Sequence, residues 1–398
     1  MNKILFLIVF LAGCATGPYE YPNLVKAPAA AKSKKKNYIV WNKKQFLKPK
    51  GLVTMSRSTI FALADQFGAE NMKPLEGVNG FTVKNAEKPL SITSDEWVVT
   101  EEIEYHILQP YTCWKSSPIQ CPSEPTPSPN PGPNPSPGPG PTPIEADKSW
   151  GRARVHAKEA QALVDTSQVK VCVVDTGIDL NHPNKGNLLE AKDFTGKGTA
   201  QDGQGHGTHT AGTVAGNGGV GISRAKLLIC KGLSDNGSGT SSALAQCLTW
   251  CGQRGAQIVS NSWGSTQSDA LINGAINSLT QRGVYVFVAA GNDSGPVNWP
   301  AKLAGSNTLV YAIAASDQGD RITSFSSRGP EVRFISPGAS IVSNWIGGGF
   351  RALDGTSMAT PHAAAICAFG IASGKKPCVI ANGSVGSYPF ADALATAQ

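Results

Sequence analysis

Short apolar runs alternate with helix-like stretches through the second half of the chain. These runs are continuous and rich in valine and isoleucine, and they lie at 169–174, 227–229, 258–259, 284–288 and 309–313. A continuous apolar run of this length suits a strand that is buried on both faces, as in a parallel sheet. Residues 144–398 therefore predict an α/β domain with a mostly parallel sheet and helices on both of its faces.

A smaller α+β unit is predicted over residues 37–110. Strand-like runs occur at 38–41, 80–83 and 96–99, and residues 58–67 carry apolar side chains at helical spacing. A unit of about seventy residues has only marginal stability when it folds alone.

A proline-rich tract separates the two units. Residues 111–143 hold two cysteines and then, from 122 onward, a proline at nearly every second position. Such a tract cannot pack a core and favours the extended polyproline II conformation, which reaches roughly 70 Å at about 3.1 Å per residue. We therefore place a domain boundary in this segment.

The first residues have the pattern of an export signal. A short positive segment with Lys3 precedes the apolar residues 4–12, which are too few to span a bilayer. The segment ends in Leu11-Ala12-Gly13-Cys14, which resembles a bacterial lipobox. That resemblance implies a signal peptide over residues 1–13 and an exported lipoprotein anchored through Cys14, and Ala15 implies the outer membrane. An ordinary signal peptide that happens to contain a cysteine is the alternative.

The net charge of +7 is unevenly distributed. Residues 1–50 hold ten lysines and a single acid, Glu20, so they carry +9 and the rest of the chain carries −2. A nucleic-acid-binding face would need basic residues on the folded part, so we expect no nucleic acid partner. The lysine-rich residues 14–36 form a tether that either lies against anionic lipid or serves as a solvated spacer.

The remaining cysteines favour disulfides over metal binding. They stand at positions 113, 121, 172, 230, 247, 251, 367 and 378, and none of them shows CxxC spacing. Export places them in an oxidising compartment, where disulfides form. Cys113 with Cys121, and Cys367 with Cys378, are plausible local pairs.

The other four cysteines are harder to pair. Cys247 and Cys251 lie four residues apart on a predicted helix, where the geometry of a bond between them would be strained. Cys172 lies in an apolar strand, so it belongs to the core or to a disulfide rather than to a reactive site.

Three segments place reactive side chains where a site could form. Asp175 follows a buried strand, at the carboxyl end where sites form in open α/β sheets. His206 stands among small residues, and Ser357 begins an alanine-rich helix, where backbone N–H groups favour negative charge. Taken singly, each residue has a plainer interpretation as a turn residue, a packed histidine or a helix cap. Together they supply an acid, a base and a nucleophile.

These motifs and their order resemble the subtilases, a family of serine endopeptidases. The similar segments are 173–177, 205–212 and 345–362, and the last looks most like proteinase K and its relatives. The resemblance covers roughly residues 150–380. It implies a subtilisin-like fold and peptide-bond hydrolysis through an acyl-enzyme intermediate without a cofactor.

The resemblance also implies a role for each residue of the site. Ser357 would be the nucleophile, His206 the general base and acid, and Asp175 the group that orients the imidazole. Asn292 would donate its side-chain amide to the oxyanion, beside the backbone N–H of Ser357. A turn residue next to Gly291 is the plainer interpretation of Asn292.

The other two histidines of these motifs are expected to be structural. They are His209, which follows His206 in the same motif, and His362, which follows the nucleophile.

The substrate would bind as an added strand between two segments that match the family's binding walls. The wall residues are Gly237, Ser238 and Gly239 on one side and Ser262, Trp263 and Gly264 on the other. Trp263 either reshapes the pocket or is merely packed, so no preference for the residue before the scissile bond is assigned.

Two departures from the family pattern concern calcium. Residues 216–221 form a short loop without a carboxylate, and Arg333 stands where relatives often have a calcium-binding aspartate. A guanidinium repels a cation and can replace its charge, so we expect no metal at these two places. Calcium at other places stays open.

Residues 37–110 resemble, more weakly, the inhibitory propeptides of the family, whose last strand lies in the active site. Residues 101–108 would be that strand. The implied organisation is a signal peptide, a lipidated tether, an inhibitory propeptide, a linker at 111–143 and a catalytic domain at 144–398. A cut between Leu108 and Glu124 would release a soluble enzyme, expected to be a monomer, from the membrane.

Two other classes of protein compete with this interpretation. A binding lipoprotein could carry an inert protease fold, but inert relatives commonly lose a catalytic residue and none of the four is missing here. A serine esterase would carry its nucleophile in a GxSxG turn, whereas Ser357 lies in Gly355-Thr356-Ser357-Met358-Ala359.

Overall fold

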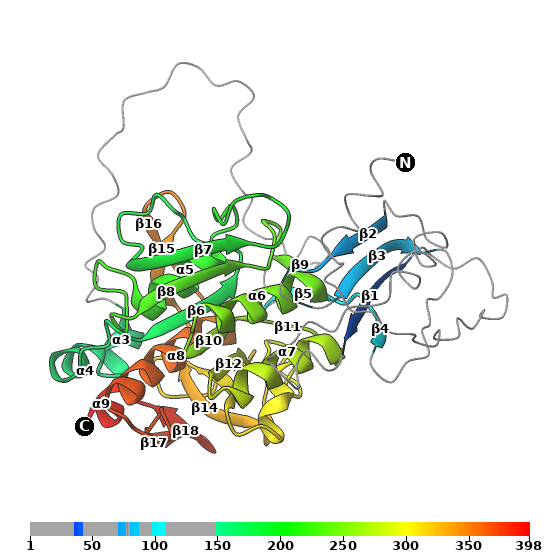
Figure 1. Ribbon diagram of the computed structural model, residues 1–398. Coiled ribbons are helices and arrows are strands. Elements are labelled where there is room, and N and C mark those ends of the chain that lie inside the picture. Colours follow the sequence, from blue (N-terminus) through cyan, green and yellow to red (C-terminus); the bar gives the residue numbers. More distant parts are fainter. Residues whose placement is uncertain (1–35, 43–70, 77, 79, 87–96, 109–148) are drawn as a thin grey trace, which may run out of the picture.

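The structure is a computed structural model that describes residues 36–42, 71–76, 78, 80–86, 97–108 and 149–398. The predicted helix at 58–67, the proline-rich linker, Cys14, Cys113 and Cys121 lie outside the described residues. No helix within these ranges is long and apolar enough to cross a membrane. Figure 1 shows a small antiparallel sheet beside a larger α/β domain.

Nine strands form the central sheet of the larger domain, in the order β17-β18-β14-β13-β12-β10-β6-β8-β7. All neighbours are parallel except β17 and β18, which are antiparallel. The five predicted strands are the five contiguous central ones: β13 (Val310–Ser316), β12 (Tyr285–Ala289), β10 (Ile258–Asn261), β6 (Lys170–Asp175) and β8 (Lys226–Lys231). Their side chains are almost entirely buried, which explains the continuous apolar runs.

Helices cover this sheet in two pairs, α5 (His206–Ala215) against α8 (Thr356–Ala372) and α6 (Ser241–Gln253) against α7 (Ala270–Gln281). Helix α8 is buried from its first residue to Gly370, so its alanine-rich sequence is that of a helix surrounded by core. The predicted α/β fold is therefore confirmed. Three short helices complete the domain: α3 (Trp150–Arg154), α4 (Ala157–Leu163) and α9 (Ala393–Ala397), with a 3-10 turn at η5 (Ala301–Gly305).

The outer strands were not predicted from the apolar pattern. They are β7 (Asn187–Asp193), β14 (Val332–Pro337), β17 (Ala381–Val385) and β18 (Tyr388–Ala391), and a separate hairpin joins β15 (Ile341–Trp345) to β16 (Gly349–Leu353). Strands β7 and β17 lie at the two edges of the sheet and keep many side chains exposed or half-buried. A partly exposed edge strand has no continuous apolar run to mark it.

The small sheet has the order β2-β3-β1-β4, and all of its neighbours are antiparallel. Its strands are β1 (Lys36–Asn42), β2 (Met72–Pro74), β3 (Gly80–Ala86) and β4 (Trp97–Glu101). Three of them contain the predicted runs, and the short β2 was not predicted. The chain then leaves this sheet as β5 (Glu104–Ile107), which pairs with β9 (Ser238–Thr240) and β11 (Trp263–Gly264) of the larger domain.

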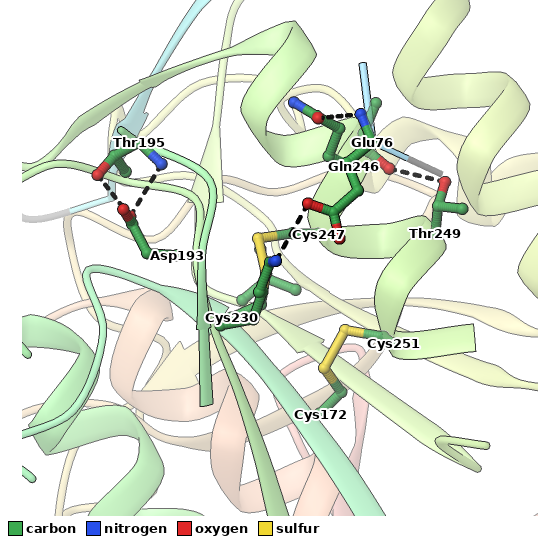
Figure 2. The surroundings of a disulfide bond; sticks show 12 residues. Glu76, Cys172, Asp193, Thr195, Cys230, Gln246, Cys247, Thr249 and Cys251 are labelled. Atoms are coloured by element: carbon green, nitrogen blue, oxygen red, sulfur yellow. Dashed lines mark hydrogen bonds and ion pairs between the residues drawn. A yellow bond between two sulfur atoms is a disulfide. The ribbon is translucent and has the colours of Figure 1, made fainter. Parts of the chain in front are cut away.

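Three disulfides join the described cysteines. Cys367–Cys378 is the expected local pair, and Cys247 and Cys251 are indeed not bonded to each other. Instead, Cys247 bonds to Cys230 on β8 and Cys251 bonds to Cys172 on β6 (Figure 2). Helix α6, which follows β9 directly, is thereby tied to two central strands.

Candidate active site

A carboxylate and an imidazole meet where β6 ends and α5 begins. The Nδ1 atom of His206 lies 2.7 Å from the Oδ1 atom of Asp175, and both side chains are fully buried. The same carboxylate accepts hydrogen bonds from the backbone N–H of Thr176 at 2.7 Å and the hydroxyl of Thr210 at 3.2 Å. These donors fix the carboxylate, which in turn fixes the tautomer of His206 with Nε2 free to accept a proton.

A second buried carboxylate, which the sequence analysis missed, holds the start of α5. Asp202 accepts from the hydroxyl of Thr176 at 3.0 Å, the N–H of Gly205 at 2.9 Å and the N–H of Thr208 at 2.9 Å. No helix-cap pattern in the sequence marks it, because the N-cap residue of α5 is Gly205 and Asp202 lies three positions earlier. Asp202 therefore anchors the loop that delivers His206.

Ser357 and Asn292 converge on one carbonyl oxygen, that of Leu108. The Oγ atom of Ser357 donates to this oxygen at 2.7 Å, and the side-chain amide of Asn292 also donates to it. The other amide atom, Asn292 Oδ1, accepts from both the N–H and the hydroxyl of Thr356 at 2.9 Å, which sets the orientation of the amide. Thr356 is thus a further positioning residue that the sequence analysis did not single out.

Gly355 leaves space for the same carbonyl. A Cβ atom at this position would lie 2.9 Å from the oxygen of Leu108, and the backbone has φ +147°, which L residues rarely adopt. The glycine before Ser357 is therefore required both by the backbone and by the group that approaches the site.

The hydrogen bond between serine and histidine is not formed in this arrangement. Ser357 Oγ lies 3.0 Å from the carbonyl oxygen of Ser262 as well as 2.7 Å from that of Leu108. His206 Nε2 has no hydrogen-bond partner among the described residues. The hydroxyl is directed at the carbonyl of the bound strand instead of at the imidazole.

The two predicted walls both pair with β5. On one side, Tyr105 lies opposite Gly239 and the N–H of Ile107 donates to the carbonyl of Gly237 at 2.9 Å. On the other side, Ile107 lies opposite Trp263 and the N–H of Leu108 donates to Ser262 at 3.4 Å. The remaining predicted wall residues, Ser238 and Gly264, both lie opposite His106. Of the segment predicted at 101–108, residues 104–107 thus form the strand between the walls, whereas Glu101 is the last residue of β4.

Glycines in the walls make room for the side chains of this strand. A Cβ atom on Gly237 would lie 3.0 Å from Ile107, and one on Gly264 would lie 3.2 Å from the side chain of Leu108. Larger residues at these two positions would displace the strand.

The sequence left open whether Trp263 reshapes the pocket or is merely packed. Its side chain is fully buried, and its indole N–H donates to the carbonyl of Val174 at 3.1 Å. Its ring also meets the ring of Tyr105 edge to face, with 5.2 Å between the centroids. Trp263 is therefore packed into the core and at the same time contacts a side chain of the bound strand.

His209 and His362 have structural surroundings. Burial lowers the pKa of His209 to about 3 and that of His362 to about 4. His209 Nε2 bonds the carbonyl of Ile341 at 2.8 Å, and His362 Nδ1 lies 2.9 Å from the carbonyl of Met358. Both imidazoles are neutral at pH 7 and are held by backbone groups, away from the reacting atoms.

Arg333 contacts a backbone carbonyl at the place where the sequence suggested that a guanidinium replaces a cation. Its Nη2 atom donates to the carbonyl of Ala304 at 2.7 Å. Within the described ranges, no three His, Cys, Asp or Glu side chains gather in a group that could hold a metal ion.

Comparison with known proteins identifies the family. The family model of the subtilases matches residues 166–383. This chain belongs to the subtilase family. The chain is 40% identical over 226 residues to subtilisin Savinase of Lederbergia lenta, which covers 55% of this chain and 82% of that protein. It is 36% identical over 230 residues to thermitase of Thermoactinomyces vulgaris, covering 56% and 81%.

Other similar subtilases are longer than the matched region. M-protease of Shouchella clausii is 40% identical over 226 residues, and this match spans 58% of its length. The subtilase fold and the membership in a family of serine endopeptidases, both expected from the sequence, are confirmed. Each of these matches extends over little more than half of the chain.

Proposed function

We propose that the chain is a serine endopeptidase made as a self-processing zymogen, with Asp175, His206 and Ser357 as its catalytic triad. The observation that carries this proposal is the position of the Leu108 carbonyl, whose oxygen accepts from both Ser357 Oγ and the Asn292 amide. A carbonyl held beside a serine hydroxyl by an amide donor is the arrangement needed for acyl transfer.

The proposed reaction follows from these contacts. His206 Nε2 takes the proton of Ser357 as Oγ attacks the carbonyl carbon, and the Asn292 amide and the backbone N–H of Ser357 stabilise the resulting oxyanion. Asp175 orients the imidazole and stabilises its protonated form. His206 then gives the proton to the leaving amine, and water releases the acyl group by the same steps in reverse.

Strand β5 would be the inhibitory end of a propeptide that the enzyme itself cuts. Its pairing with both walls supports a first cut after Leu108, at the beginning of the range expected from the sequence. Contacts outside the strand also support docking of the small sheet on the catalytic domain. The N–H of Glu76 donates to Gln246 on α6 (Figure 2). The carboxylate of Glu76 lies 3.0 Å from Lys192 Nζ, and Ser242 donates to Glu102.

The finer points of localisation belong to the same proposal. Several of the similar proteins are subtilisins, which supports export of this chain. We propose lipidation at Cys14 and release of the catalytic domain by cleavage after Leu108, since the anchor, inhibitor, spacer and protease follow one another in this order. A mature enzyme that still carries Cys14 would overturn the release step.

The test is casein degradation by the full-length chain and by Ser357→Ala, with N-terminal sequencing of both. We expect degradation and a new N-terminus at Gln109 in the wild type only. Two intact, inactive chains would favour an inert binding protein, and activity in Ser357→Ala would exclude this nucleophile. Hydrolysis of a chromogenic ester without hydrolysis of casein would favour an esterase.

A further inference from the structure

Asp235 lies in the turn that forms one wall of the peptide-binding site. The turn connects β8 to β9, and the N–H of Ser234 closes it by donating to the carbonyl of Ser238 at 2.8 Å. Two residues after Asp235, the carbonyl of Gly237 accepts from the N–H of Ile107 on the bound strand at 2.9 Å. The side chain of Asp235 is therefore attached to the backbone that pairs with this strand.

The carboxylate of Asp235 contacts the loop that leads to His206. Its Oδ1 atom accepts from the N–H of Gly203 at 3.1 Å. The approach is close, because a Cβ atom at position 203 would lie 2.6 Å from the Oδ2 atom of Asp235. Two residues after Gly203, Gly205 is the N-cap residue of α5, and His206 is the first residue of this helix. The wall and the loop that delivers the imidazole are thus joined by one side chain.

Lys231 extends this contact to the catalytic aspartate. It lies opposite Asp175 in the pairing of β8 with β6, and its side chain is fully buried. Its ammonium donates to the Oδ1 atom of Asp235 at 2.8 Å and to the backbone carbonyl of Thr176. The N–H of Thr176 in turn donates to the carboxylate of Asp175 at 2.7 Å. Displacement of Thr176 would therefore disturb the carboxylate that orients the imidazole.

The buried side of this cluster is the important one. Burial acts to raise the pKa of Asp235, but hydrogen bonds from Lys197 and Lys231 lower it to about 2, so the carboxylate is ionised at neutral pH. Lys197 is 40% exposed, whereas Lys231 is 0% exposed. An exposed ion pair contributes little, but a buried ammonium is costly unless a carboxylate is paired with it. Asp235 therefore keeps Lys231 in the position from which it holds Thr176.

We propose that Asp235 is a positioning residue of the protease. It holds the loop that leads to His206 directly, and it holds the backbone after Asp175 through Lys231. One carboxylate thereby fixes the catalytic acid and base relative to the wall that takes the substrate strand. The inference rests on the proposed protease function, because it concerns the rate of that reaction.

The first experiment measures kcat and KM separately on a peptide anilide with the sequence of residues 105–108. It compares the wild type with Asp235→Ala, both matured from the full-length chain. A misplacement of about 1 Å can cost on the order of 10²-fold in rate, so we expect kcat to fall by about 10- to 100-fold with a much smaller change in KM. A rise in KM at unchanged kcat would mean that Asp235 supports only the wall, and it would overturn the inference.

Glu190→Ala is the matched control for the loss of an ion-paired carboxylate. Glu190 is 41% exposed, close to the 36% of Asp235, and it lies 2.8 Å from Arg254. This ion pair joins β7 to the C-cap residue of α6, away from the loops at 175–176 and 202–205. We expect the kcat of the wild type in Glu190→Ala. An equal decrease of kcat in Glu190→Ala and Asp235→Ala contradicts the inference, since the loss of any ion pair would then suffice.

A double variant separates positioning from the cost of an unpaired charge. Asp235→Ala leaves the buried ammonium of Lys231 without its carboxylate, which destabilises the fold. Asp235→Ala/Lys231→Met removes this ammonium as well, so thermal unfolding should show that stability recovers. The links to Gly203 and Thr176 stay broken in this variant, and we expect kcat to remain low. Recovery of kcat together with stability would refute the positioning role.

A second experiment needs no catalysis. In the full-length Ser357→Ala chain, proton NMR follows the Nδ1–H of His206, which is buried in its 2.7 Å hydrogen bond to Asp175. We expect this signal to shift or disappear in Asp235→Ala and to stay in place in Glu190→Ala. An unchanged signal in Asp235→Ala refutes the positioning role. A changed signal, in a protein whose wild type cleaves no peptide, supports the positioning role and refutes the protease function instead.

Discussion

The two disulfides of α6 should be the main covalent source of stability in the catalytic domain. Cys172–Cys251 and Cys230–Cys247 join the helix to β6 and β8, with Cα–Cα distances of 5.8 and 5.6 Å. These are the strands that end at Asp175 and lead toward the wall β9. All four cysteines are buried. Loss of either bridge therefore loosens the connection between the core and one side of the peptide-binding site.

The expected magnitude follows from the loops that the bridges close. The sequence separations are 79 residues for Cys172–Cys251, 17 for Cys230–Cys247 and 11 for Cys367–Cys378. Restriction of the unfolded chain by loops of these lengths stabilises the fold by about 4.5, about 3.1 and about 2.8 kcal/mol respectively. For a domain of this size, the first value corresponds to a decrease in Tm of roughly 9 to 18 °C.

The assay is thermal unfolding of three paired Cys→Ala variants, one for each bridge. All are made in the Ser357→Ala background, so that self-digestion does not interfere, and Cys367→Ala/Cys378→Ala is the matched control with the shortest loop. We expect the largest loss of stability for Cys172→Ala/Cys251→Ala. An equal or smaller loss than in the control would refute the argument from loop length.

Three further changes test other parts of the structure. Asn292→Ala should lower kcat by about 10² to 10³ with little change in KM, measured on a peptide anilide, because the amide acts on the oxyanion. Addition of calcium should raise the urea midpoint of Arg333→Asp more than the midpoints of the wild type and of Arg333→Ala. Only in Arg333→Asp does a carboxylate stand near the Ala304 carbonyl, so that the two oxygens could bind a cation together. His209 and His362, whose pKa values lie at about 3 and about 4 in the fold, take up protons on unfolding below pH 6.5. As the pH falls from 6.5 toward the folded pKa, each of these histidines should therefore lower the unfolding free energy by about 1.4 kcal/mol per pH unit. In urea titrations of His362→Gln, the unfolding free energy should decrease less steeply with falling pH than in the wild type.

The sequence predicted what depends on local pattern. The runs that became β6, β8, β10, β12 and β13 are apolar without interruption because both faces of these strands are covered, so composition alone identifies them. In edge strands such as β7, exposed and half-buried side chains alternate only in part. The local sequence of such a strand therefore does not differ clearly from that of a loop. Asp175, His206 and Ser357 became candidates for a similar reason, since each lies in a short run of small residues at the boundary of an element.

Pairings between distant residues could not be predicted in the same way. The spacing of Cys247 and Cys251 excluded a bond between them, but their partners on β8 and β6 depend on how α6 packs. Asp202 is an ordinary polar residue in the sequence, and its hydrogen bond from the hydroxyl of Thr176 forms only when α5 meets the end of β6. Such residues acquire their role from tertiary contacts, which no single window of the chain contains.

The position of β5 also explains why no substrate preference could be predicted from the sequence. Trp263 alone left the pocket undefined, because an aromatic residue in a wall can either fill a subsite or support one. The structure shows that Trp263 is buried in the core and that its ring also meets the ring of Tyr105 on β5 edge to face. This contact joins two residues that lie far apart in the sequence, so no local window of the chain could have predicted it.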